Sequence, residues 1–141
     1  MPSAGGESPS ITMVCLLGET NDRMVVAEVA YQNRWDALFI DHKEHALSAF
    51  EHVHAQIVLV DRDAAGPEWR SIIAKFAEAS PGACVILVSK VLDDYLWNEV
   101  VCNGGYEILA KPLREDEVRR TVRLARSYWS SANKVLSSPS H

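Results

Sequence analysis

The sequence has few cysteines, no long apolar run and no signal segment, and so lacks the features of disulfide-rich, membrane-spanning and secreted proteins. Its 141 residues include only three cysteines, Cys15, Cys84 and Cys102, and no CxxC pair, so neither a disulfide framework nor a zinc site is expected. No apolar run approaches the roughly 20 residues that a membrane-spanning helix needs. The first ten residues, MPSAGGESPS, lack the basic and apolar segments of a secretory signal. We therefore expect one domain, located in the cytoplasm.

Motifs for nucleotide binding are absent as well. The sequence contains neither GxGxxG nor GxxxxGK[ST], the two glycine patterns that cradle phosphates. Its net charge of −5 gives no overall attraction to nucleic acid. No nucleotide cofactor and no direct nucleic-acid partner are expected.

Short apolar runs alternate with segments of helical spacing. The runs are nearly continuous in Val, Ile and Leu, which is typical of strands buried on both faces of a parallel sheet; they cover residues 11–17, 37–40, 56–60, 83–88 and 106–110. The pattern predicts a (βα)5 fold of the doubly wound α/β class. The predicted organisation is a disordered N-terminal tail (1–10), one domain (11–130) and a disordered C-terminal tail or linker (131–141).

Helix caps can be predicted for two of the helical segments. Asn21 or Asp22 is a plausible cap for the first, and Asp93 for the fourth, because short polar side chains satisfy the free N–H groups of a first helical turn.

Polar residues follow the predicted strands. Glu19 comes after the first strand, Asp61 after the third, Ser89 after the fourth and Lys111 after the fifth. Ligands of doubly wound sheets bind outside the carboxyl ends of the strands. Clustered carboxylates attract Mg²⁺, and a carboxylate can act as a nucleophile and form an acyl phosphate. Each residue alone is better explained as a turn or cap residue than as a catalytic one. The coincidence of all four at strand ends favours a phosphoryl-transfer site.

These segments resemble the receiver domain of two-component response regulators. IVLVD (57–61) is similar to that family's third strand, VILVS (85–89) to its fourth, and NGGYEILAKP (103–112) to its fifth strand with the lysine and a proline that usually follows a cis bond. The resemblance covers about residues 11–129. It implies a flavodoxin-like sheet with strand order 2-1-3-4-5.

The resemblance also implies a function and a site. Asp61 would be the phosphoacceptor, Ser89 the switch hydroxyl and Lys111 the phosphoryl partner, while Glu19, Asp61 and the backbone carbonyl of Asp63 would bind Mg²⁺. The donor would be a histidine kinase or a phosphotransfer protein. The implied module is a signalling protein and not an enzyme, and its output face comprises the fourth helix, fifth strand and fifth helix.

The sequence departs from the family pattern at three places. Gly18 stands where the first of two acids is usual, so one metal carboxylate is missing and we predict weak Mg²⁺ binding. The loop after Asp61 reads AAGPEW instead of MPGMDG. Ile108 occupies the aromatic switch position; Tyr106 is nearby, and which of the two packs beneath the switch face is open. A phosphorylation-independent pseudo-receiver is therefore the alternative, followed by an unrelated small α/β protein.

Basic residues gather near the C-terminus. This row has three interpretations: a solvated helix face, contacts to DNA phosphates, or a two-fold interface with acids of neighbouring elements. The last would make a homodimer through the output face. The arginines are Arg114, Arg119, Arg120, Arg123 and Arg126, and the acids are Asp93, Asp94, Glu99 and Glu107.

Overall fold

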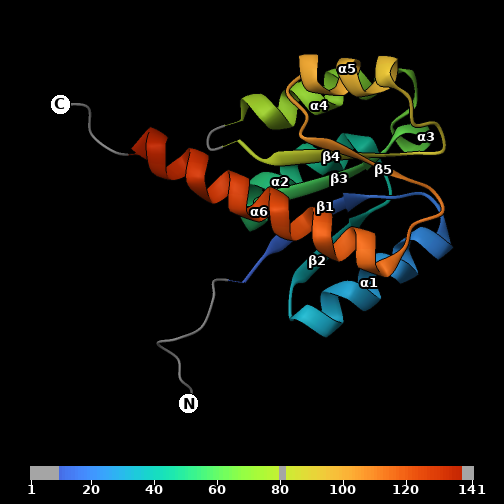
Figure 1. The fold of residues 1–141 in the computed structure, drawn as a ribbon, viewed down its shortest axis with the longest axis horizontal. Helices are drawn as coiled ribbons and strands as arrows, with labels where there is room; N and C mark the ends of the chain where they lie inside the picture. The colour runs from blue at the N-terminus through green and yellow to red at the C-terminus, as the bar shows by residue number, and fades with distance from the viewer. Residues whose placement is uncertain (1–9, 80–81, 138–141) are drawn as a thin grey trace.

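A computed structural model describes residues 10–79 and 82–137. Its centre is a five-stranded parallel sheet in the order β2-β1-β3-β4-β5, seen in Figure 1. The predicted fold class and strand order are confirmed. The strands are β1 (Thr12–Leu16), β2 (Asp36–Ile40), β3 (Ile57–Asp61), β4 (Cys84–Ser89) and β5 (Glu107–Ala110).

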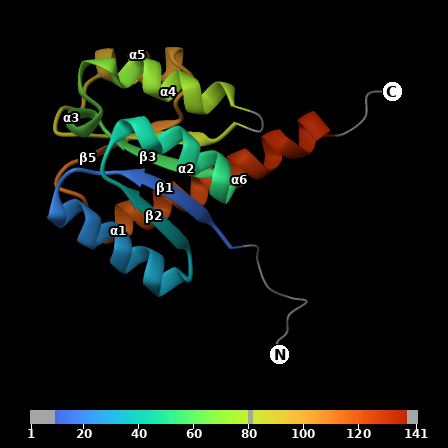
Figure 2. The same cartoon turned by 180° about the vertical axis from the view of Figure 1, so that it is seen from behind.

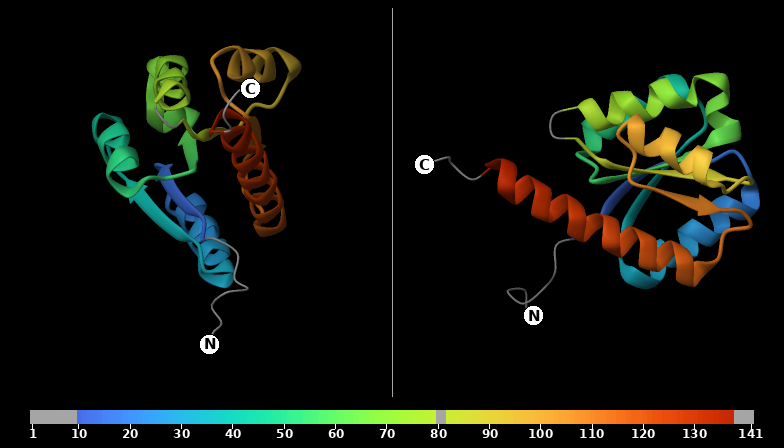
Figure 3. Two further views of the ribbon diagram at one scale, coloured as in Figure 1. Left: turned by 90° about the vertical axis from the view of Figure 1, so that its left-hand side faces the viewer. Right: turned by 45° about the horizontal axis from the view of Figure 1, so that its top comes forward.

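Helices cover both faces of the sheet (Figures 2 and 3). The major helices are α1 (Thr20–Asn33), α2 (Ala46–Val53), α4 (Trp69–Glu78), α5 (Asp94–Cys102) and α6 (Glu115–Ser137), with short turns η2 (Lys43–His45), α3 (Arg62–Ala65) and η3 (Gly66–Glu68) between them. Within the described residues, no helix combines the length and the apolar character needed to cross a membrane.

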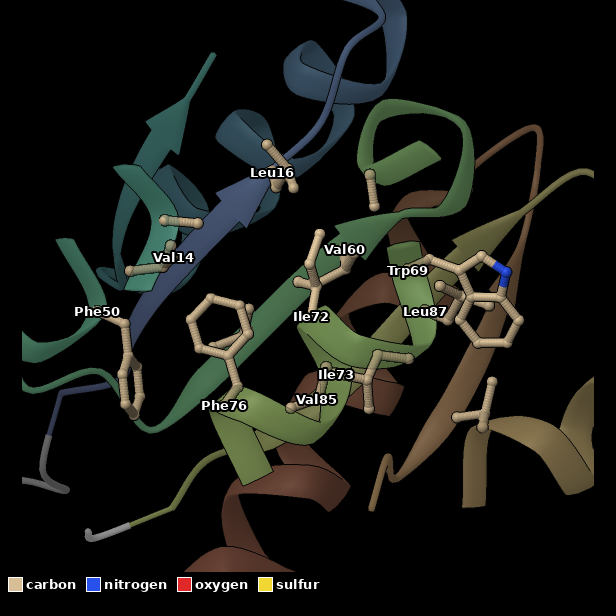
Figure 4. Close-up of a cluster of buried hydrophobic side chains, with 14 of the residues drawn as sticks. Val14, Leu16, Phe50, Val60, Trp69, Ile72, Ile73, Phe76, Val85 and Leu87 are labelled. Carbon is tan, nitrogen blue, oxygen red and sulfur yellow. The ribbon is translucent and has the colours of Figure 1, made fainter. Parts of the chain in front are cut away.

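Two hydrophobic layers hold the sheet in place, one on each face. Alternate residues of a strand point to opposite faces, so Val14 and Leu16 of β1 join one layer, and Met13 and Cys15 join the other. The first layer packs against α2 and α4 through Phe50, Ile73 and Phe76 (Figure 4), and against α5 through Val100. The second packs against α1 and α6 through Val26, Val29, Val118 and Val122. Burial on both faces explains why the central strands read as continuous apolar runs.

Three boundaries differ from the sequence-based expectations. Helix α1 begins at Thr20 with Glu19 at its N-cap, so neither Asn21 nor Asp22 is the cap. The segment directly after β3 contains α3 where no helix was predicted, and the helical region predicted to begin at Pro67 begins as η3. Helix α6 continues to Ser137, so residues 131–137 are helical and not part of a tail. The remaining residues of the two expected tails, 1–9 and 138–141, lie outside the described residues.

The cap of α5 was predicted correctly and supports a first mutational test. The Asp93 carboxylate accepts a hydrogen bond of 2.8 Å from the backbone N–H of Leu96. We expect Asp93→Ala to lower the free energy of unfolding by about 1 kcal/mol, since a free N–H of the first turn loses its partner. Urea denaturation measures the loss. Asp94→Ala, at the adjacent exposed acid, is the control; equal losses in the two variants would contradict the capping role.

Candidate functional site

The carboxyl ends of four adjacent strands bring the predicted polar residues to one edge of the sheet. The register pairs Leu16 with Val60, Asp61 with Val88 and Ser89 with Ala110. The segments that follow β1 and β5, which carry Glu19 and Lys111, therefore lie on either side of Asp61. This is the crevice where ligands bind in doubly wound sheets.

The Lys111 ammonium is the centre of this cluster. Its Nζ lies 2.9 Å from Oδ2 of Asp61 and 3.0 Å from Oε1 of Glu19. The bond between Lys111 and Pro112 is cis, as the resemblance predicted, and the Lys111 N–H donates to the carbonyl of Ser89 at 2.9 Å. Three of the four predicted polar side chains thus meet directly, and the fourth residue is linked through its backbone.

A third carboxylate, which sequence reasoning missed, completes the cluster. Asp22 lies in the first turn of α1, and its Oδ2 is 2.9 Å from Lys111 Nζ. Both side chains are almost fully buried. Gly18 leaves one acid of the family pattern missing, and Asp22 adds a different carboxylate to the cluster, because a helix that begins at Thr20 places it in the first turn beside the strand ends. The available signal was the spacing of Glu19 and Asp22, because side chains three residues apart lie on the same face of a helix.

The charge of Lys111 is maintained by these neighbours. Burial opposes the ammonium form, but the carboxylates of Asp61, Asp22 and Glu19 outweigh burial and hold the pKa of Lys111 above its usual value of 10.5. The hydrogen bond from Lys111 is also the main reason that the pKa of Glu19 lies below its usual value of 4.5. Lys111 is therefore held in its charged form beside Asp61.

Asp61 is enclosed. Its side chain is only 2% exposed. Oδ1 accepts a hydrogen bond of 2.9 Å from the Asp63 N–H, which makes Asp61 the N-cap of α3, and Oδ2 is held by Lys111. Each oxygen of the carboxylate therefore has one hydrogen-bond partner and a further lone pair. Of Asp63, the backbone amide is the group that contacts Asp61.

Ser89 ends the neighbouring strand with a buried hydroxyl. Its Oγ accepts a hydrogen bond of 3.0 Å from the Val91 N–H, and the residue is 3% exposed. A hydroxyl can rotate and donate elsewhere, so Ser89 has the chemistry of a switchable donor at the sheet edge.

The chemistry of the site fits Mg²⁺. All acidic ligands are oxygens, which this ion prefers, and three carboxylates against one ammonium leave the cluster net negative. Glu19 is the most open of them, with 54% of its side chain exposed. In the described part of the chain, no three His, Cys, Asp or Glu side chains could hold a metal by themselves. Magnesium commonly takes one or two carboxylates and keeps several waters.

The two candidates for the switch position separate in the structure. Ile108 of β5 is buried in the layer beneath α4 and α5. Tyr106 precedes the strand and packs against Tyr128 of α6, with 5.2 Å between ring centroids. Ile108 therefore packs toward α4 and α5, whereas Tyr106 packs toward α6.

Helix α6 directs two of its arginines toward α1. Arg119 donates to Gln32 at 3.2 Å, and Arg123 donates to Asn33 at 2.7 Å. Glu99, one of the acids proposed as a two-fold partner, is instead paired with Arg70 of α4 within the chain. The arrangement places these two arginines away from the α5–β5–α6 face.

Comparisons with known proteins identify the fold. No family model and no curated protein matches the chain. Solved structures do match: a response regulator from Thermotoga maritima has a TM-score of 0.77 at 19% identity, covering 84% of this chain and 99% of its own. Chemotaxis response regulator CheY4 of Vibrio cholerae matches with a TM-score of 0.75 at 10% identity, and the match covers 83% of this chain and 99% of CheY4. The BeF3-activated N-terminal receiver domain of Klebsiella pneumoniae RstA matches with a TM-score of 0.70 at 12% identity, and the match covers 81% of this chain and 97% of that domain.

The topology and the site edge define a flavodoxin-like, doubly wound α/β protein. More specifically, the chain has the fold of a response regulator receiver domain, with nearly the whole of each neighbouring receiver matched.

Proposed function

We propose that the chain is a cytoplasmic receiver module of two-component signalling that accepts a phosphoryl group on Asp61. The observation that carries this proposal is the pairing of Asp61, at the end of the central strand β3, with Lys111 at 2.9 Å. A buried nucleophilic carboxylate with a permanent cation beside it suits acyl-phosphate formation. The donor is a phosphohistidine of a histidine kinase or a phosphotransfer protein.

The reaction assigns a role to each side chain. A carboxylate oxygen of Asp61 attacks phosphorus, the phosphorus–nitrogen bond of the donor histidine breaks, and an acyl phosphate forms. Lys111 stabilises the negative charge of the phosphoryl oxygens. Glu19 and Asp61, with the backbone carbonyl of Asp63, would hold Mg²⁺ weakly, and the ion when bound neutralises phosphoryl charge.

Ser89 would then pass the change to the rest of the domain. Its hydroxyl exchanges the contact with Val91 for the phosphoryl group, which biases the loop between β4 and α5. The α5–β5–α6 face beyond this loop carries exposed apolar side chains, namely Trp97, Val101, Leu124 and Tyr128. Such a patch suits a protein partner or a second copy of the chain, so a homodimer through this face stays a prediction.

The test is phosphorylation by a small donor. The purified protein is incubated with Mg²⁺ and acetyl phosphate, and intact mass is measured beside Asp61→Asn and Asp94→Asn, the latter at an exposed acid of α5. We expect the wild type and Asp94→Asn to gain one phosphoryl group and Asp61→Asn to gain none. No gain by the wild type, under conditions that label a known receiver in parallel, would overturn the proposal.

A second function is favoured by one observation, the enclosure of Asp61. Both of its oxygens are engaged and its side chain is 2% exposed. A pseudo-receiver that binds a protein partner without phosphate would keep such a closed site. In that case the wild type and Asp61→Asn would bind the partner equally well, with or without acetyl phosphate.

A further inference from the structure

We propose that Asp22 is the positioning residue for Lys111, and that it performs from helix α1 the role of the acid that is missing at Gly18. The inference rests on the proposed function, since positioning matters for transfer to Asp61. Asp22 lies outside the three segments that resemble receiver motifs, which cover residues 57–61, 85–89 and 103–112.

Helix α1 determines where Asp22 lies. The helix begins at Thr20, directly after the Glu19 cap, so Asp22 falls in its first turn. The residue is 4% exposed. The adjacent Arg23 turns away, donating to the Leu17 carbonyl at 2.7 Å and pairing with Asp41. Asp22 therefore faces the sheet edge, while the next residue anchors the helix on the other side.

The contact of Asp22 is specific to Lys111. Its Oδ2 lies 2.9 Å from Nζ but has no well-directed hydrogen-bond partner within the described residues. A carboxylate buried without compensation is costly, so the lysine charge is what stabilises it in this place. Conversely, Asp22 gives the ammonium a buried anchor that does not belong to the nucleophile.

That second anchor matters during the reaction. When Asp61 becomes an acyl phosphate, its carboxylate no longer holds Lys111 as before. Glu19 is half-exposed and would be shared with the metal. Asp22 is buried and remains free to hold the ammonium beside the phosphoryl oxygens. Asp22 should therefore affect the rate of transfer more than the binding of the donor.

Gly18 offers a direct test, because an acid can be restored there. A Cβ at Gly18 would meet only the Cβ of Ala64, at an ordinary 3.6 Å, and the backbone is outside the positive-φ region. An aspartate at this position is therefore tolerated, and would lie at the end of β1 beside Glu19.

The experiment measures phosphorylation rate against acetyl phosphate concentration. For Asp22→Asn, which keeps the shape and removes the charge, we expect a fall in maximal rate of about tenfold to a hundredfold with little change in the half-saturating concentration. Gly18→Asp combined with Asp22→Asn should recover most of the loss. Glu28→Gln, at an exposed acid on the same helix, is the control and should match the wild type.

A second measurement works whether or not the protein is phosphorylated. The buried anchors of Lys111 slow the exchange of its ammonium protons with solvent, so the NMR signal of this ammonium group at neutral pH should broaden in Asp22→Asn and sharpen again in Gly18→Asp/Asp22→Asn. Asp22→Ser serves if Asp22→Asn unfolds. An unlabelled wild type would overturn the proposed function alone. An unchanged Lys111 ammonium signal in Asp22→Asn, or a double variant no faster than Asp22→Asn, would overturn the role of Asp22.

Discussion

Replacement of Lys111 by methionine is expected to lower the free energy of unfolding by about 3–5 kcal/mol at neutral pH, the range for removing one partner of a buried ion pair. The aliphatic stem of methionine fills much of the same space, so the loss comes mainly from charge. Asp22 and Asp61, with side chains 6% and 2% exposed, would be left without their shared cation. Chemical denaturation of both proteins gives the difference directly.

The effect of Lys111 should depend on pH in a predictable direction. Because the folded-state pKa of Lys111 is raised, its contribution is fully present below the ordinary value of 10.5 and is lost as pH rises through the folded pKa. The pKa of Glu19 is lowered, so its contribution is present above 4.5 and is lost as pH falls through the folded pKa. The difference in unfolding free energy between the wild type and Lys111→Met should therefore be greatest between about pH 4.5 and pH 10.5 and should become smaller at lower and at higher pH.

Two further variants show whether burial of the Asp22–Lys111 ion pair causes the destabilisation of Lys111→Met. Lys90→Met removes an exposed lysine near Glu19 and should change stability by no more than about 0.5 kcal/mol. Adding Asp22→Asn to Lys111→Met should recover part of the loss, because one buried, unpaired charge disappears. Equal destabilisation by Lys90→Met and Lys111→Met would contradict this account.

The sheet could be predicted from the sequence because strands that are buried on both faces consist almost entirely of apolar residues. Strands such as β3, which is buried at every position, must be apolar on both faces, and a polar residue at their end is conspicuous. Asp61, Ser89 and Lys111 were found in this way. The parallel order then follows from short, right-handed crossovers, so the strand ends had to meet at one edge.

Asp22 could not be found by the same reasoning. Asp22 is a short polar residue between a strand and a helix, which is typical of a helix cap. The local sequence fits a cap as well as it fits a buried partner of Lys111. Which role it takes depends on a shift of two or three residues in the N-cap of α1, from the predicted Asn21 or Asp22 to Glu19. Element boundaries of this size are decided by tertiary contacts, here the ion pair with Lys111, and these connect residues far apart in the sequence.

The segment after β3 escaped prediction for a related reason. The residues RDAA make a single helical turn, too short for a periodic pattern, and the turn exists because the Asp61 carboxylate caps it. The candidate nucleophile is thus also a structural residue. Phosphorylation on the capping oxygen Oδ1 would weaken that cap, which would link the chemistry of the site to the conformation of α3.

The aromatic pair beneath α2 and α4 carries the other large expected effect. Phe76 is 1% exposed and meets Phe50 edge to face, with 5.3 Å between ring centroids (Figure 4). Phe76→Ala removes apolar contacts and leaves a cavity that packed neighbours fill only in part, so we expect a loss of about 3–5 kcal/mol in unfolding free energy. Urea denaturation with an unchanged slope measures it.

A matched truncation shows that burial is responsible. Tyr31→Ala removes an aromatic ring that is 82% exposed on α1 and should cost within about 0.5 kcal/mol. Because Phe76 lies in the core layer and not at the carboxyl edge, the NMR signal of the Lys111 ammonium group in folded Phe76→Ala should equal that of the wild type. An altered signal would mean that α4 packing also determines the geometry around Asp61, and that fold and site cannot be varied independently in this chain.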